Sequence, residues 1–220
     1  MRAFFVLALL LGTRRSELLR AEWENVDLDR GGIRLPNTKA GNDHDLPLSR
    51  EAVTILRNLP RLLGNPYVFP SPVEPGKPMR DVKRQWKRIR ESAAIDLWTA
   101  ANANRVAELR AEGKADADAP HETERLRALI LTEIRTTGAS PFDVRLHDLR
   151  RTVGSWLAMS GNSLQLIGKV LNHADESTTQ IYARLHQDAA RSALDQHAVH
   201  LLTVAGAKSG EARLRKLLGA

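Results

Sequence analysis

The chain has 220 residues, a net charge of +7 at pH 7, and an apolar fraction of 42%. This length suits one large domain with its own core, and the basic excess favours a polyanion as partner, although a merely basic soluble protein has the same composition. The sequence holds no cysteine, which excludes disulfides, thiolate catalysis and cysteine-based zinc sites and fits a reducing cytoplasm.

The first eleven residues predict a buried apolar helix, which Gly12 separates from a second helix over residues 14–22. The apolar run lacks the small-residue cleavage site of a signal peptide and is too short to cross a bilayer. We therefore expect a cytoplasmic protein that makes no contact with membranes.

Residues 33–35 and 45–48 have the pattern of two short strands, and the turn-rich connection between them carries Lys39. A small antiparallel sheet follows from this pattern. Ser49 is a suitable N-cap for a helix that continues to residue 59.

Residues 81–94 predict an amphipathic helix with one apolar face. Its other positions are rich in basic residues, which form either a solvated face or a phosphate-contacting one. As candidate DNA-binding residues we take Lys83, Arg84, Lys87, Arg88 and, later in the chain, Arg151.

Residues 96–140 have the character of an insertion, with helical patterns over 97–112 and 121–136 and a slight excess of acidic residues. A helical hairpin is the simplest structure for them. From residue 146 onward the expected helices cover 150–160, 164–171, 188–204 and 211–218, with another that Ser177 caps and that carries Tyr182. The predicted fold class is mainly α with a small antiparallel β-sheet (α+β).

Arg14 and Arg150 are suited to binding a phosphodiester, because the planar guanidinium holds two oxygens at once and stays protonated. His147 and Arg150 are three residues apart and share a helix face. In isolation this short motif is more often structural, with a satisfied histidine and a surface ion pair.

Tyr182 follows His173 by nine residues, which on one straight helix would put the two on opposite faces, about 13 Å apart. The polar run at residues 174–177 breaks the helix, so both side chains can face one cleft. A tyrosine hydroxyl becomes a nucleophile when neighbouring arginines favour its phenolate. By itself, Tyr182 would be read as a half-buried helix tyrosine.

Lys39 has the chemistry of a general acid for a departing 5′ oxygen, although a turn lysine alone is usually a solvated one. The histidines show no helical His-x-x-x-His pair with a carboxylate, so no catalytic metal is expected.

Taken in order, these residues resemble the catalytic set of the tyrosine recombinase (phage integrase) family: an Arg in Gly-x-Arg-x-x-Glu, a hairpin Lys, His-x-x-Arg, a Leu-Gly-His segment, and a Tyr nine residues later. The matching positions are Arg14, Lys39, His147, Arg150, His173 and Tyr182. The resemblance extends from Phe4 to about Ala189, interrupted by the insertion. Leu11 and Asn172 replace a usual threonine and glycine, and neither change removes a group that the chemistry needs.

The resemblance implies site-specific DNA strand exchange through a 3′-phosphotyrosyl intermediate formed by Tyr182, without metal or other cofactor. Arg14 and Arg150 would clamp the phosphate, and the two histidines would donate hydrogen bonds and relay protons. Glu17, one turn from Arg14, would support the site sterically or through a salt bridge. The implied partners are double-stranded DNA, further copies of the chain in a tetramer on DNA, and an accessory directionality protein. The DNA partner implies that the protein is found at the nucleoid.

In domain terms, residues 1–205 are expected to form the catalytic domain and residues 206–220 a tail that docks on a neighbouring protomer, with the family's N-terminal core-binding domain absent. Two other functions remain open from the residues: a type IB topoisomerase, and a non-catalytic helix-turn-helix DNA-binding protein over residues 156–171.

Overall fold

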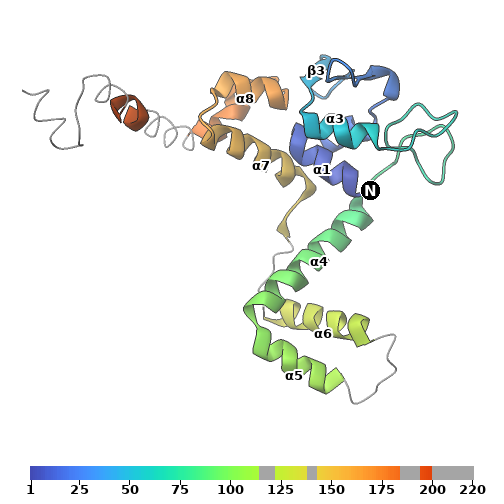
Figure 1. Cartoon of the computed structure of the whole chain (residues 1–220), viewed down its shortest axis with the longest axis vertical. Helices are drawn as coiled ribbons and strands as arrows, with labels where there is room; N and C mark the ends of the chain where they lie inside the picture. The colour runs from blue at the N-terminus through green and yellow to red at the C-terminus, as the bar shows by residue number, and fades with distance from the viewer. Residues whose placement is uncertain (114–121, 138–142, 184–193, 200–220) are drawn as a thin grey trace, which may run out of the picture. The chain divides into compact units, whose positions relative to one another are not determined.

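The computed structural model describes residues 1–113, 122–137, 143–183 and 194–199 (Figure 1). The chain divides into two compact units. One contains Met1 and residues 79–148, and the other contains residues 2–78 together with the chain from Leu149 onward.

The larger unit contains a three-stranded antiparallel sheet in the order β1-β2-β3. Its strands are β1 (Val26–Asp27), β2 (Gly32–Leu35) and β3 (His44–Pro47). The inward-facing positions alternate along β2 and β3 with the strand period of two. The two predicted strands are therefore confirmed to within a residue or two, whereas β1 was not predicted.

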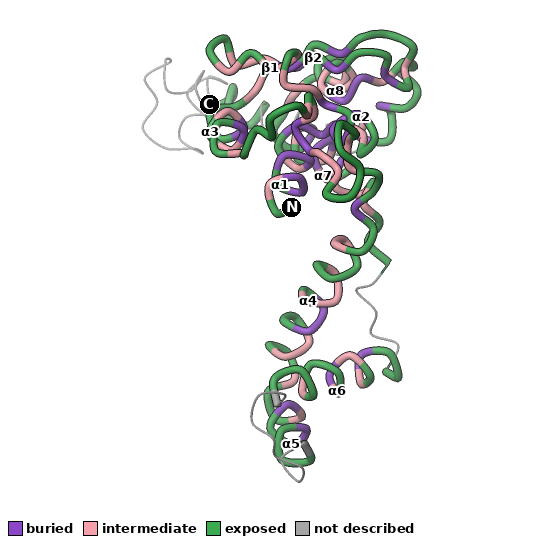
Figure 2. Tube along the Cα trace, turned by 90° about the vertical axis from the view of Figure 1, so that its right-hand side faces the viewer, coloured by how far each residue is buried: buried purple, intermediate pink, exposed green. Residues whose placement is uncertain are grey.

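Three helices pack beside the sheet: α1 (Arg2–Leu11), α2 (Arg15–Leu19) and α3 (Arg50–Arg57). As predicted, Ser49 caps α3, where its side chain accepts a hydrogen bond from the amide of Ala52 at 3.2 Å. The buried residues of α1 are purple in Figure 2 and include Phe4, whose ring meets that of Phe69 edge to face. None of the described helices is long and apolar enough to cross a membrane.

Gly12 ends α1 in the left-handed region, with φ 63°. A Cβ atom there would lie 2.8 Å from Leu171 and 3.0 Å from Val153, so glycine allows the end of α1 to approach these two residues closely. Leu171 and Val153 belong to α8 (Leu164–Leu171) and α7 (Leu146–Met159), which the sequence predicted within a few residues. This close approach joins α1 to α7 and α8 around the candidate site.

After α8 the chain forms the 3-10 helix η5 (Glu176–Tyr182). The prediction that Ser177 caps an α-helix here is wrong: Asp175 is the cap, and its carboxylate accepts the amide of Ser177. Residues 194–199 are helical within the predicted helix over 188–204. The rest of that helix, the one over 211–218 and the tail at 206–220 lie outside the described residues.

The smaller unit contains α4 (Lys83–Ala101), α5 (Ala103–Gly113) and α6 (Glu122–Thr136). α4 continues well past the predicted end at residue 94, so the predicted helix over 97–112 is divided at Asn102. The three helices share a core of their own, made of Ala94, Ile95, Val106, Leu109, Ile130 and Ile134. The described part of residues 96–140 therefore packs as a helix pair, α5 and α6, together with α4, which begins well before residue 96.

Candidate active site

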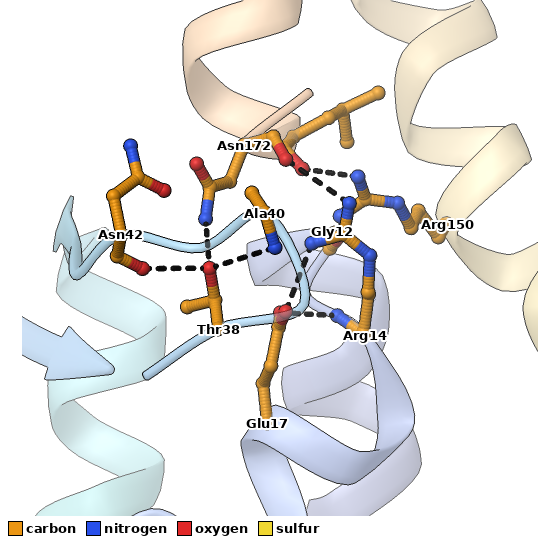
Figure 3. A network of polar contacts seen from close by, with 9 residues as sticks. Gly12, Arg14, Glu17, Thr38, Ala40, Asn42, Arg150 and Asn172 are labelled. Carbon is orange, nitrogen blue, oxygen red and sulfur yellow. Dashed lines mark hydrogen bonds and ion pairs between the residues drawn. The ribbon is translucent and has the colours of Figure 1, made fainter. Parts of the chain in front are cut away.

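Arg14 is held in place by two contacts (Figure 3). Its Nη1 donates to Glu17 Oε1 at 2.8 Å, and its Nη2 donates to the carbonyl of Asn172 at 3.1 Å. The backbone amide of Arg14 also donates to Glu17 Oε2 at 3.1 Å, which is one half of a capping box at the start of α2. The expected support of Arg14 by Glu17 is thus a direct, mostly buried ion pair.

Arg150 is only 4% exposed, and its guanidinium donates to two backbone carbonyls. Nη1 donates to Gly12 at 2.8 Å and Nη2 donates to Leu171, so Arg150 fixes the ends of α1 and α8 to α7. Burial, followed by repulsion from Arg14, lowers the pKa of Arg150 to about 10. The group still carries its charge at neutral pH, and two guanidinium cations therefore lie within electrostatic reach of each other.

The turn between β2 and β3 is fixed by Thr38, which flanks Lys39. Thr38 Oγ1 donates to the carbonyl of Asn42 at 2.7 Å and accepts from Nδ2 of Asn172 at 2.8 Å. Lys39 itself is exposed beside this anchored residue. The hairpin lysine is thus carried on a turn that is bonded to the residue after α8.

Asn172 has a structural role that the sequence reasoning missed. It adopts φ 49°, in the left-handed region, which asparagine tolerates better than most residues. Through its side chain it binds Thr38, and through its carbonyl it binds Arg14. The amide supplies a contact between the hairpin and α8 that glycine could not make.

His173 is oriented by η5. Its Nδ1 lies 2.8 Å from Thr179 Oγ1, and Thr179 is buried. A pocket of ≈ 510 Å³ borders the ring, lined by residues of α8 and η5 and by Asn42.

The side chain of Tyr182 packs against α7. It does not face a cleft shared with His173, as the sequence had led us to expect. It is 4% exposed and packs with Val153, Ile167 and Leu171. A Cβ atom on Gly154 would lie 2.3 Å from its Cζ and 2.5 Å from its hydroxyl oxygen, so the ring rests directly on this glycine. Gly154 is one helical turn after Arg150, which brings the phenol close to the arginine.

Burial raises the pKa of Tyr182, and the positive charges of Arg150 and Arg151 oppose this effect. The buried phenol is therefore a weaker nucleophile than a free tyrosine at neutral pH. A substrate can reach the hydroxyl oxygen only if the ring moves off Gly154.

The remaining predicted residues are all exposed. His147 lies in the first turn of α7, three residues before Arg150. The candidate DNA-binding residues on α4 are Lys83, Arg84, Lys87 and Arg88, and Arg151 is on α7. Lys87 makes a weak ion pair with Glu91 at 3.9 Å, which solvent largely screens.

Comparison with known proteins gives a consistent result along the chain. The sequence model of the phage integrase family matches residues 1–112 and 114–189. Tyrosine recombinase XerD of Vibrio vulnificus (strain YJ016) is 27% identical over 206 residues, which cover 89% of this chain and 52% of that protein. The shufflon-specific DNA recombinase of Escherichia coli is 44% identical over 66 residues, or 30% of this chain and 17% of that protein.

Among solved structures, the XerA recombinase has a TM-score of 0.51 at 21% identity, covering 88% of this chain and 57% of that one. The Tn1549 transposon integrase in complex with transposon right end DNA has a TM-score of 0.54 at 16% identity, covering 89% and 58%. These likenesses confirm the predicted fold. The chain spans about half or less of the length of the curated relatives that it matches.

Proposed function

Because the chain belongs to the phage integrase family, we propose that it catalyses site-specific DNA recombination by tyrosine transesterification. The observation that carries this proposal is the gathering of Arg14, Arg150 and Tyr182 around the ends of α1 and α8. Two arginines that are fixed before the substrate arrives suit a phosphodiester, whose charge grows in the transition state.

In the proposed reaction, the Tyr182 hydroxyl passes its proton to one of the two site histidines, and its oxygen attacks a phosphodiester. A 3′-phosphotyrosyl bond forms while the bond to the 5′ oxygen breaks. A 5′ hydroxyl from a partner strand then attacks the phosphotyrosine and releases the tyrosine. The number of phosphoester bonds is unchanged in each step, so the reaction needs no nucleotide to supply energy, and the two arginines supply the positive charge.

The other side chains have separate tasks in this scheme. Arg14 and Arg150 bind the nonbridging oxygens with the guanidinium donors that their present contacts leave over, since each fork has five N–H groups. His173, held by Thr179, and His147 donate hydrogen bonds to the phosphate. Lys39, on the anchored hairpin, protonates the 5′ oxygen as it leaves.

The substrate of this proposal is double-stranded DNA, in the cytoplasm at the nucleoid. The exposed basic residues of α4 and Arg151 contact its backbone, and this contribution depends on salt because it releases counterions. Strand exchange joins four DNA strands, so the proposed assembly is a tetramer on DNA, with an accessory protein that sets the direction.

The test is a covalent adduct assay with nicked duplexes tiled across the DNA that flanks the gene. Wild-type protein should form a protein–DNA adduct that Tyr182→Phe abolishes, because the change removes only the hydroxyl. Tyr67→Phe is the matched control, since the chain has two tyrosines, and it should leave the adduct intact.

An adduct that maps to Tyr67, or none with any duplex, would refute the proposal. Joining of strands from two different duplexes separates recombination from the topoisomerase reaction, which rejoins the original strand. Binding without an adduct would instead favour a DNA-binding protein.

A further inference from the structure

The hydroxyl of Thr38 lies at the centre of the turn that carries Lys39 (Figure 3). It donates to the carbonyl of Asn42 at 2.7 Å and accepts from the amide of Ala40 at 3.3 Å. The backbone adds two bonds, from the amide of Thr38 to Asn42 at 3.2 Å and from the amide of Gly41 to Thr38 at 3.0 Å. All four bonds lie within residues 38–42, so they fix the shape of the turn but not its position on the protein.

A side-chain hydrogen bond ties this turn to the end of α8. Thr38 is 6% exposed, and its hydroxyl also accepts from Nδ2 of Asn172 at 2.8 Å. A hydroxyl has one hydrogen and two lone pairs, so the bonds to Asn42, Ala40 and Asn172 use all of them. Because the hydrogen points to the Asn42 carbonyl, the partner at the end of α8 must be a donor. The amide of asparagine meets this requirement, whereas a carboxylate or a glycine would not.

Asn172 is placed for this contact by the way α8 ends. Its backbone is left-handed, with φ 49°, and the amide of the next residue, His173, bonds back to the carbonyl of Gly168 at 3.0 Å. The carbonyl of Asn172 accepts from Nη2 of Arg14 at 3.1 Å, and the residue is 8% exposed. One buried residue therefore joins an arginine of the proposed phosphate clamp to the turn that carries Lys39.

We propose that Asn172 is a positioning residue for Lys39: its side-chain amide holds the turn at residues 38–42 where Lys39 can reach the departing 5′ oxygen. This inference rests on the proposed function, because it takes Lys39 to be the general acid. Lys39 is exposed and its stem is flexible, so the direction from which its ammonium approaches depends on where the turn is held. Through Asn172, the proton donor and Arg14 are held at a common point.

Replacing Asn172 with glycine isolates the contribution of the amide. Glycine adopts the left-handed conformation without steric cost, so the carbonyl contact to Arg14 is kept while the bond to Thr38 is lost. Thr38→Val removes the other end of the same bond. Asn37→Gly is the matched control, because Asn37 lies in the same hairpin with the same φ of 49°. Its exposed side chain takes no part in the hydrogen bond that its backbone amide makes to Asp43 at 3.1 Å.

The first experiment measures amide hydrogen exchange in the free protein. The amides of Thr38 and Gly41 are bonded within the turn, whereas the amide of Leu48 bonds to Gly31 at 2.8 Å, at the other end of the β2–β3 hairpin. Detachment of the turn exposes Thr38 to water, and the loss of one hydrogen bond shifts such an opening about 2- to 10-fold. In Asn172→Gly, exchange at Thr38 and Gly41 should accelerate by this factor while Leu48 keeps its rate. Unchanged exchange in the turn overturns the inference.

The second experiment compares adduct formation on ordinary DNA and on DNA with sulfur in place of the bridging 5′ oxygen. The sulfur leaves readily without a proton, so this substrate hardly needs Lys39. Asn172→Gly and Thr38→Val should be about 2- to 10-fold slower than wild type on ordinary DNA and equal to it on the sulfur substrate. Asn37→Gly should match wild type on both substrates. In a Lys39→Ala background, Asn172→Gly should cause no further loss, because both changes affect the same step.

Equal slowing of Asn172→Gly on both substrates would show that Asn172 acts through Arg14 or the fold, and would overturn the role assigned to it. A rate equal to that of wild type on ordinary DNA, or a further loss in the Lys39→Ala background, would do the same. If Asn172→Gly does not fold, Thr38→Val decides by the same comparison of substrates. If no protein, including wild type, forms an adduct while Asn172→Gly still speeds exchange in the turn, the recombination reaction fails and the anchoring of the turn stands.

Discussion

Replacing Gly154 with alanine tests the resting position of the nucleophile. The new methyl group would lie 2.3 Å from Cζ and 2.5 Å from the hydroxyl oxygen of Tyr182. Non-bonded carbon atoms are most stable at about 3.5–4.0 Å, so the ring must move away from α7. The substitution therefore acts on Tyr182 without changing any proposed catalytic residue.

Two effects of opposite sign determine the stability of this variant. Overpacking costs about 1–3 kcal/mol, and alanine within a helix is favoured over glycine by about 0.8–1.0 kcal/mol. The net loss is about 0–2 kcal/mol, which lowers Tm by at most about 8 °C for a chain of this size. The strain raises the population of molecules in which the Tyr182 ring has moved off Gly154 by about 5- to 150-fold. If release of the ring limits the reaction, the rate of adduct formation rises.

The measurement is an ultraviolet titration of tyrosinate in the Tyr67→Phe background, together with thermal unfolding. Burial is the main cause of the raised pKa of Tyr182, so this pKa should fall toward its ordinary value in Gly154→Ala. In a Tyr182→Ala background the clash is absent, and the same change should stabilise the protein instead. An equal stability loss in both backgrounds would show that the ring does not rest on Gly154.

Three further predictions address the other groups. Arg150→Lys should reduce adduct formation at least about 10²-fold and also lower Tm, because the carbonyls of Gly12 and Leu171 lose the fork that binds both. Lys39→Ala should be slow on ordinary DNA but largely rescued by a 5′-bridging phosphorothioate, whereas Arg150→Lys should not; equal rescue of both removes the general-acid role. Because burial at the start of β3 lowers the folded-state pKa of His44, the unfolded chain takes up a proton first and stability falls as pH drops below about 6.5; unfolding measured against pH should show a smaller loss in His44→Gln.

Local patterns in the sequence predicted most of the helices and both longer strands, since apolar spacing records which face is buried. β1 escaped prediction because two residues between turns carry no period. α4 extends to Ala101 because its second half packs on α5 and α6, a contact that no local pattern records. The structure of β1 and the length of α4 thus depend on the elements that they pair with or pack against, rather than on their own residues.

The candidate site could likewise be predicted only in part from local sequence. Arg14, Arg150 and Tyr182 were predicted from residue type and spacing, and the structure places them around the ends of α1 and α8, while their catalytic roles stay a prediction. Asn172 appeared to be a neutral replacement, yet its amide binds Thr38, which is remote in the sequence.

Without a bound anion, the candidate site carries a positive charge that a phosphodiester can neutralise. Two guanidinium groups and the Glu17 carboxylate leave one net positive charge at the junction of α1, α2, α7 and α8. Holding Arg150 in this buried position beside Arg14 is unfavourable, as its lowered pKa of about 10 records, and the carbonyls of Gly12 and Leu171 offset part of that cost. A bound phosphate relieves the repulsion that remains. Binding of the phosphate thus offsets the free energy that it costs to hold the two arginines together in the folded protein. A preorganised site favours its anion over water in this way.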